Sequence, residues 1–215
     1  MRNSDNQTMS EIDAYFQRRK TGQIVIPDAD ENRIHLNLKK DIIESINSKS
    51  FPIVISGDVG TGKTYAMACI FNAWKVRTGE AIIWRNCGEL LNQIMQCRTS
   101  VNKSIQVTRH DGLSYTEFEN SIMRKISEAK LLCLDDVGVR RPTEAQREVF
   151  NNILDSRHDD KKNLATIVTT NLHTEKMFTD VFDERSFSRL FSGRSIIVRG
   201  KDRRLENSSG GFCDV

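Results

Sequence analysis

One eight-residue stretch, placed between two regular patterns, constrains this chain more than any other feature. Residues 57–64 read Gly-Asp-Val-Gly-Thr-Gly-Lys-Thr, which matches the pattern Gly-x-x-x-x-Gly-Lys-Ser/Thr. An apolar run of strand length (52–56) precedes it, and a helical pattern (65–76) follows. Glycines let successive backbone N–H groups point into one concavity, and the following helix adds its positive end. The stretch therefore predicts a site for nucleotide phosphates, rather than a tight turn that binds nothing.

The residue types of this loop predict its ligands. The Lys63 ammonium is expected to reach the β- and γ-phosphates, and the Thr64 hydroxyl is expected to ligate Mg²⁺. The predicted nucleotide-binding residues are Gly57, Asp58, Val59, Gly60, Thr61, Gly62, Lys63, Thr64 and Tyr65.

The rest of the chain alternates between two periodicities. Apolar runs of strand length recur at 52–56, 81–84, 130–134, 164–169 and 195–198, and each gap contains a helical pattern. Short apolar strands that alternate with helices indicate a mostly parallel sheet covered on both faces. We therefore predict an α/β three-layer sandwich around a five-stranded sheet, with ligands at the carboxyl ends of the strands.

Several sequence signals predict where the helices of the chain start and stop. Capping-box patterns at Asn86-x-x-Glu89, Ser114-x-x-Glu117 and Thr143-x-x-Gln146 predict helix starts, and Gly193 predicts a helix stop. Helices are also expected over 11–20 and 39–47, separated by an irregular connector. Residues 99–113 read as a possible long loop.

Composition excludes several classes of protein. The 215 residues carry a net charge of +3, and no apolar run approaches the roughly 20 residues of a membrane-spanning helix. The N-terminus lacks a secretory signal, and the five cysteines show no metal-ligand spacing, so they are expected to be reduced, mostly buried thiols. We expect a cytoplasmic protein with no membrane partner.

A second predicted strand ends in two carboxylates. Residues 131–136 read Leu-Leu-Cys-Leu-Asp-Asp, and the strand end should lie at the same sheet edge as the phosphate loop. Asp135 is expected to hold Mg²⁺ with Thr64, and Asp136 to polarise the attacking water. The alternative is a plain acidic turn.

Polar residues near the C-terminal part add further candidates. Thr170 and Asn171 follow an apolar strand and are placed to hydrogen-bond the attacking water or the γ-phosphate, although Asn171 would also serve as a helix cap. Arg185 and Arg189 are spaced as neighbours on a helix, a spacing that by itself favours a solvated helix face. An arginine can also stabilise a transferring phosphoryl group from a neighbouring subunit.

The order of these motifs resembles the AAA+ ATPases of the DnaC/IstB group, which are bacterial and phage helicase loaders and transposition helper ATPases. The resemblance runs from about residue 41 to residue 204 and includes Asp135-Asp136-Val-Gly138, Val-Thr-Thr-Asn171 and Glu-Arg185-x-x-x-Arg189. It implies ATP as the nucleotide, 57–64 as Walker A and Asp135/Asp136 as Walker B.

The resemblance also implies roles for later residues. Asn171 corresponds to sensor 1, and Arg189 to an arginine finger that acts on ATP bound by the adjacent protomer of a homo-oligomer. Arg185 is a second candidate for the finger, and Arg203 or Arg204 for a late sensor arginine. Residues 94–129 would form an extra helical insertion, which lines a single-stranded DNA channel in relatives.

Together these features predict an ATPase that assembles on single-stranded DNA and loads or remodels a replicative helicase. Basic segments 72–109 and 176–204 are candidate phosphate contacts, or simply solvated charges. Trp74 and Trp84 are expected in the core or half-buried, rather than as base-stacking platforms. The expected divisions are a short N-terminal helical extension (1–48), the ATPase domain (49–204) and a flexible tail (205–215), with a reduced or absent lid.

Other functions remain open at this point. A transposition helper that delivers a transposase would use the same chemistry, and a nucleotide-binding adaptor would need no turnover. A small-molecule kinase is disfavoured because no Arg-rich lid stands out, and a GTPase because no Asn-Lys-x-Asp follows the fourth strand. Asp136 replaces the glutamate usual in AAA+ proteins, so slow or partner-stimulated hydrolysis is expected.

Overall fold

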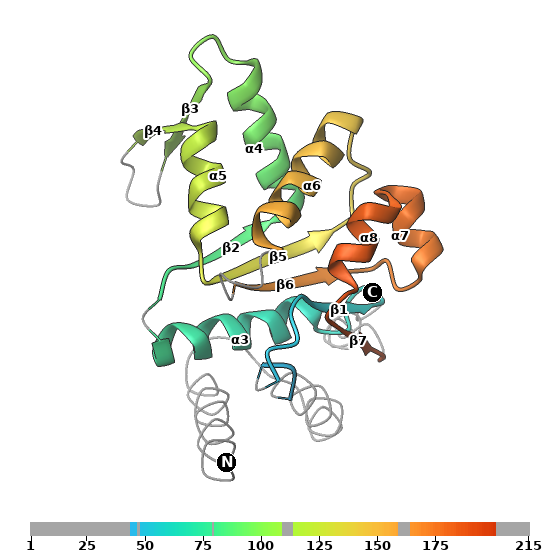
Figure 1. The fold of residues 1–215 in the computed structure, drawn as a ribbon. Helices are drawn as coiled ribbons and strands as arrows, with labels where there is room; N and C mark the ends of the chain where they lie inside the picture. Colours follow the sequence, from blue (N-terminus) through green and yellow to red (C-terminus); the bar gives the residue numbers. More distant parts are fainter. Residues whose placement is uncertain (1–43, 47, 79, 109–113, 159–163, 201–215) are drawn as a thin grey trace, which may run out of the picture.

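The computed structural model describes residues 44–46, 48–78, 80–108, 114–158 and 164–200 (Figure 1). The predicted helix over 11–20, most of that over 39–47, and Arg203, Arg204 and the tail lie outside these residues. The described elements, in chain order, are β1 (Ile53–Gly57), α3 (Lys63–Thr78), β2 (Ile82–Asn86), α4 (Cys87–Thr99), β3 (Ser104–Thr108), β4 (Ser114–Phe118), α5 (Glu119–Glu128), β5 (Leu131–Val137), α6 (Glu144–Arg157), β6 (Ala165–Thr170), α7 (Glu175–Val181), α8 (Glu184–Leu190) and β7 (Arg194–Val198).

The five predicted core strands form one parallel sheet in the order β2-β5-β6-β1-β7. Strand β1 pairs on one side with β6 (Ser56 opposite Thr170) and on the other with β7 (Gly57 opposite Val198). Because all five strands run the same way, the residues that follow β1, β5 and β6 lie at one edge of the sheet. The α/β prediction is confirmed.

Helices cover both faces of this sheet, which gives three layers (Figure 1). Helix α3 lies on one face, and α4, α5, α6, α7 and α8 lie on the other. The alternation along β1 shows the division: Ile53 and Ile55 pack with Met67 of α3, whereas Val54 packs with Phe150 of α6. All five side chains are fully buried, as is expected for a central strand covered on both sides.

The two tryptophans pack at the margin of the α3 layer, as predicted. Trp74 makes an edge contact with Phe51, with ring centroids 6.2 Å apart, and Trp84 does so with Phe71 at 5.6 Å. Both are partly buried against the core rather than presented as stacking platforms.

The segment between β2 and β5 differs from the prediction. It contains an antiparallel hairpin, β3–β4, between α4 and α5, so the insertion predicted over 94–129 is not purely helical. The predicted helix start at Ser114 is wrong, because Ser114 opens β4 opposite Thr108, and α5 begins only at Glu119. The long loop predicted over 99–113 is likewise interrupted by β3. Only pairing with the neighbouring strand β3 distinguishes this strand from a helix start.

Glu117 of β4 shows why the strand is favoured there. Its side chain is only 3% exposed, and it accepts hydrogen bonds from Gln93 (2.9 Å) and Lys125 (2.8 Å). The carboxylate thus joins the hairpin to α4 and α5, and it is unavailable for capping a helix.

Of the other predicted helix signals, two are confirmed and one is wrong. The Asn86 side chain accepts from the Glu89 N–H, and Thr143 and Gln146 form a reciprocal capping box, as predicted. Gly193 is not a helix stop, because α8 ends at Leu190. A Cβ on Gly193 would lie 2.1 Å from the Pro52 carbonyl oxygen, so this glycine instead permits two chain segments to touch.

The cysteines that the structure describes are buried and free, as expected from their apolar surroundings. These are Cys87, Cys97 and Cys133. Burial raises the pKa of the Cys87 thiol to about 12, so it stays protonated at neutral pH. No helix within the described ranges is long and apolar enough to cross a membrane.

A buried arginine ties the insertion to the sheet. Arg157, at the end of α6, is 5% exposed and donates to the carbonyls of Ile126 (2.5 Å), Ala129 (2.8 Å) and Ala165 (2.6 Å) and to the Thr166 hydroxyl (2.9 Å). Burial lowers the pKa of the guanidinium to about 10, so it remains charged at neutral pH. It satisfies the last carbonyls of α5.

Replacing Arg157 with methionine should destabilise the fold. The substitution leaves buried carbonyl groups without donors, so we expect the free energy of unfolding to fall by about 3 kcal/mol in urea titrations. Arg124→Met on the exposed face of α5 is the matched control, with little expected change. Equal unfolding midpoints for the two variants would contradict this account.

Candidate nucleotide site

The loop after β1 has the backbone shape that its glycines predict. Gly60 and Gly62 have φ angles of 76° and 94°, values that side chains with a Cβ rarely adopt. Gly57 contacts the backbone of β7 so closely that an added Cβ would lie 2.2 Å from the Val198 carbonyl oxygen. The loop is therefore held between the sheet and the first turn of α3.

Two side chains of the loop fold back onto its own backbone. The Lys63 ammonium donates to the Asp58 carbonyl at 2.5 Å, and the Thr61 hydroxyl donates to the same carbonyl at 2.9 Å. Lys63 is only 7% exposed, so its charge is held close to the loop. Asp58 and Val59 are exposed at the loop tip.

Asp135 lies against the N-terminus of α3. Its Oδ1 accepts hydrogen bonds from the Thr64 hydroxyl (2.9 Å) and from the Thr169 hydroxyl of β6 (2.5 Å). The carboxylate is 7% exposed, so two hydroxyl groups hold it in place in a shielded position. Three elements, α3, β5 and β6, thus meet at one oxygen atom.

The Thr64–Asp135 pair fits a magnesium ion. Both groups are hard oxygen ligands, and they lie 2.9 Å apart. Among the described residues there is no cluster of three or more His, Cys, Asp or Glu. Mg²⁺ is usually held by one or two protein oxygens together with substrate phosphates and water, and Thr64 and Asp135 supply two such oxygens.

Asp136 has an unusual backbone conformation. Its φ is 59°, and the pairing of β5 with β6 shifts register between Leu134 and Val137. Its N–H donates to the Thr169 hydroxyl at 3.0 Å, and its Oδ2 accepts from the Asn86 amide at 3.4 Å. A non-glycine residue in the left-handed region costs about 1 kcal/mol or more, a strain often found at functional sites. The bulge turns two adjacent carboxylates toward different partners.

The polar residues after β6 have separate positions. Thr170 is buried, donates to the Val137 carbonyl (2.7 Å) and accepts from the Leu172 N–H (3.0 Å). This structural use replaces the predicted contact of Thr170 with water or phosphate. Asn171 is half-buried just beyond β6, and it does not cap the next helix, because Thr174 caps α7.

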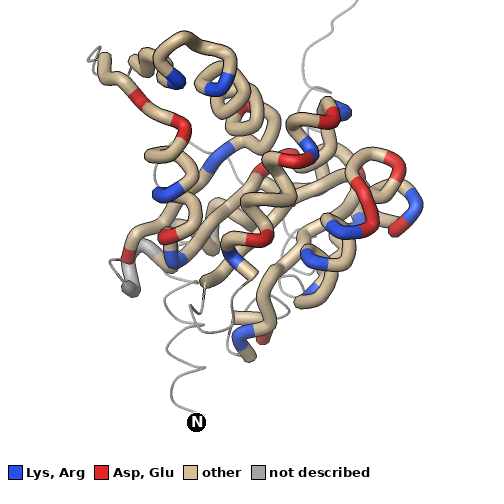
Figure 2. The backbone as a smooth tube through the Cα atoms, turned by 45° about the horizontal axis from the view of Figure 1, so that its top comes forward, with Lys and Arg blue, Asp and Glu red and all other residues tan. Residues whose placement is uncertain are grey.

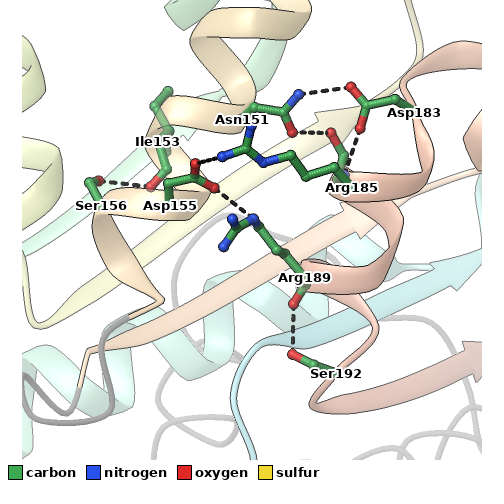
Figure 3. Close-up of polar contacts among 9 residues, drawn as sticks. Asn151, Ile153, Asp155, Ser156, Asp183, Arg185, Arg189 and Ser192 are labelled. Atoms are coloured by element: carbon green, nitrogen blue, oxygen red, sulfur yellow. Dashed lines mark hydrogen bonds and ion pairs between the residues drawn. The ribbon is translucent and has the colours of Figure 1, made fainter.

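The two candidate finger arginines meet on the opposite side of α6 from α4. Arg189 Nε lies 2.6 Å from Asp155 Oδ1, and Arg185 pairs with Asp155 Oδ2 (Figure 3). Both arginines are on α8 and the carboxylate is on α6. Neither is a freely solvated charge of the kind that their spacing alone favours.

Sequence reasoning missed three residues of these networks: Asn86, Asp155 and Thr169. Thr169 lies one residue before the polar strand end that the sequence predicts. Its side chain contacts Asp135 only because β5 and β6 pair in this register. For Asn86 the sequence predicted only a helix cap. No pattern near Asp155 in the chain indicates that it pairs with the two arginines.

With this geometry described, comparison with known proteins decides the family. The family model of IstB-like ATP binding proteins matches residues 29–194. The chain belongs to this family. The match spans the phosphate loop, both carboxylates, Asn171 and the two arginines of this IstB-like chain.

Individual relatives share low sequence identity with the chain. The replicative helicase loader DnaC of Escherichia coli K12 is 24% identical over 163 residues, which are 76% of this IstB-like chain and 59% of DnaC. The chain thus spans about three-fifths of that relative's length.

Solved structures of low identity share the fold. A crystal structure of the DnaC helicase loader aligns with a TM-score of 0.60 at 16% identity, covering 83% of this chain and 95% of that one. The replication initiator DnaA bound to AMPPCP and single-stranded DNA aligns at 0.61 and 21%, covering 83% and 49%. The IstB-like chain has the AAA+ type of P-loop NTPase fold.

Removing the Thr169 hydroxyl should weaken binding of Mg²⁺ with ATP. Thr169→Val keeps the shape but frees Asp135 to rotate away from Thr64, so we expect roughly tenfold weaker binding by calorimetry. The loss should disappear when ATP is titrated in EDTA. Thr116→Val on the exposed hairpin is the control. An equal loss with and without Mg²⁺ would contradict a metal-linked role.

The stabilisation of the fold by Asp183, the N-cap residue of α8, should depend on pH. Burial alone would raise the pKa of the Asp183 carboxyl, but hydrogen bonds from Ser186 and Asn151 and the charge of Arg147 outweigh it and lower the pKa below 3.8. Its stabilisation is therefore complete above pH 3.8 and is lost as the pH falls through the lower folded value.

Asp183→Ala should accordingly cost about 1 kcal/mol of unfolding free energy at pH 7, with the gap to wild type closing in acid. Thr174→Ala, at the uncharged cap of α7, should show a gap that does not change with pH. Denaturant titrations across pH measure both. A pH-independent gap for Asp183→Ala would refute the assignment.

Proposed function

We propose that this protein binds and hydrolyses ATP with Mg²⁺, assembles on single-stranded DNA and loads or remodels a replicative helicase. The observation that carries the ATPase part is the contact of Thr64 and Thr169 with Asp135 beside the phosphate loop. It supports the proposal because ATP hydrolysis requires a phosphate site and a metal site side by side, and this contact lies between the residues proposed for the two.

The proposal assigns a role to each residue of this edge. Residues 57–65 bind the triphosphate, with Lys63 neutralising its β- and γ-oxygens, and Thr64 and Asp135 hold Mg²⁺. Asp136 orients the attacking water, and Asn171 hydrogen-bonds the water or the γ-phosphate. A bound ion supplies Lewis-acid charge stabilisation. The ATPase domain is proposed to run from 49 to 204.

Arg189 completes the proposed site from a neighbouring subunit. It pairs with α6 of its own chain, so in this proposal it serves ATP bound by the adjacent protomer of a homo-oligomer. Such an arginine stabilises charge that develops on the transferred phosphoryl group. Hydrolysis then depends on assembly, and the short Asp136 carboxylate agrees with slow basal turnover.

The DNA part of the proposal is supported by the relatives and only modestly by charge. DnaC is named as a replicative helicase loader, and the DnaA structure contains single-stranded DNA. Figure 2 shows basic residues interleaved with acidic ones. Within the insertion, Arg98 pairs with Glu119 (2.6 Å) and Lys125 with Glu117 (2.8 Å), so part of its positive charge is already used. Binding should therefore be weak and salt-sensitive.

Two alternatives use the same residues. A transposition helper would deliver a transposase rather than load a helicase, and an adaptor would bind nucleotide without turnover. The names of the relatives favour the helicase, and with it a place in the bacterial cytoplasm. A pull-down in ATP and Mg²⁺ from the native host identifies helicase, transposase or neither.

The ATPase proposal is tested by turnover with and without single-stranded DNA. Lys63→Ala and Arg189→Ala should each lower kcat about 100-fold or more, whereas mixtures of the two should recover activity because some interfaces contain both intact parts. Wild-type turnover no greater than that of either variant would favour the adaptor. No recovery in mixtures that co-assemble would indicate that Arg189 acts within its own chain.

A further inference from the structure

The boundary between α6 and α8 is polar although helices pack there (Figure 3). The Asn151 amide donates to Asp183 Oδ2 at 2.7 Å, and its Oδ1 accepts from the Ser186 hydroxyl at 2.6 Å. Ser186 is fully buried. One turn further along α6, Asp155 meets both arginines of α8. These contacts fix the rotation of α8 against α6.

The contact between Asp155 and Arg189 leaves a particular part of the arginine available. Asp155 Oδ1 lies 2.6 Å from Arg189 Nε in an ion pair that lacks hydrogen-bond geometry, and both atoms are shielded from solvent. Among the described residues, none forms a hydrogen bond with the two terminal nitrogens of Arg189, and Asp155 is its ion-pair partner. Figure 3 shows the guanidinium of Arg189 beside the Asp155 carboxylate, joined to it by one dashed line. The side chain as a whole keeps 26% of its surface exposed.

Arg185 is used differently. Its terminal Nη2 itself pairs with Asp155 Oδ2, on the more exposed side of the carboxylate. The carboxylate therefore engages Arg185 by its terminal edge but Arg189 by its inner nitrogen. Of these two arginines, Arg189 is the one whose terminal nitrogens form no hydrogen bond with a described residue, and such nitrogens can make a bidentate contact with an anion such as a phosphate.

We propose that Asp155 is a positioning residue that holds Arg189 by Nε and so presents its terminal nitrogens to ATP on the neighbouring subunit. This inference rests on the proposed role of Arg189 in trans. A long arginine side chain loses much rotamer freedom when it reaches a phosphate, and a fixed Nε removes part of that cost beforehand. Arg185 balances the charge of the cluster and does not contact the nucleotide.

Asp155→Asn is the test, because it removes the charge and keeps the size. The ATP turnover of the assembled protein should fall about tenfold or more in kcat with KM for ATP unchanged, since the phosphate loop of each subunit is intact. Glu128→Gln, an exposed change at the end of α5 that removes the same charge, is the control and should match wild type. An Asp155→Asn kcat equal to that of Glu128→Gln would overturn the inference.

Mixtures of variant protomers distinguish a positioning role of Asp155 from a general loss of structure. Asp155→Asn protomers should recover activity when mixed with Lys63→Ala protomers, which lend an intact Arg189 to the intact phosphate loop of the former. They should not recover when mixed with Arg189→Ala protomers. Recovery with both partners, or with neither, would overturn the inference.

A further variant covers a failure of Asp155→Asn to fold. Asp155→Glu keeps the charge but displaces the carboxylate along the side chain, so it should also lower kcat at unchanged KM, and an unchanged kcat would refute positioning. The proposed function has a separate outcome. If Arg189→Ala itself hydrolyses ATP as fast as wild type, the role of Arg189 in trans fails, whatever Asp155 does.

Discussion

Parallel pairing of five strands is the constraint on which the candidate site depends. It brings the ends of β1, β5 and β6 to one edge, although 71 residues separate Thr64 from Asp135. Thr169 then donates to Asp135 from the neighbouring strand, and the bulge beside it directs Asp136 elsewhere. A shift of one residue in the pairing of β5 with β6 would turn Asp135 to the other face of the sheet and separate it from α3.

The sequence allowed most of the sheet to be predicted, because each strand is a short apolar run whose pattern is local. The phosphate loop was also predictable, because its glycine pattern can be recognised without knowing any contact to a distant segment. The hairpin β3–β4 was missed for the opposite reason: its residues are mostly polar, and its two strands are defined by their pairing with each other. Gly193 carries a helix-stop signal, yet its role depends on the backbone of Pro52, which is remote in the chain.

The candidate site was predictable to a similar degree. Lys63, Thr64 and Asp135 stood out by motif, and the structure brings Thr64 and Asp135 within 2.9 Å, while their roles remain predictions. Thr170 was misjudged because a strand-end hydroxyl bonds neighbouring backbone as readily as a ligand. Asn86, Asp155 and Thr169 could not be found, since each acts through a residue on another element.

The close contact between Gly57 and Val198 links two parts of the molecule that serve different sites. Strand β7 follows α8 after only three residues, and one of them, Gly193, rests on the backbone next to β1. The backbone contacts of Gly57 and Gly193 thus connect the end of α8 to the phosphate loop over a short path through β7. In the proposed assembly, this short connection through β7 would couple the contact at one subunit's α8 to that subunit's own nucleotide loop.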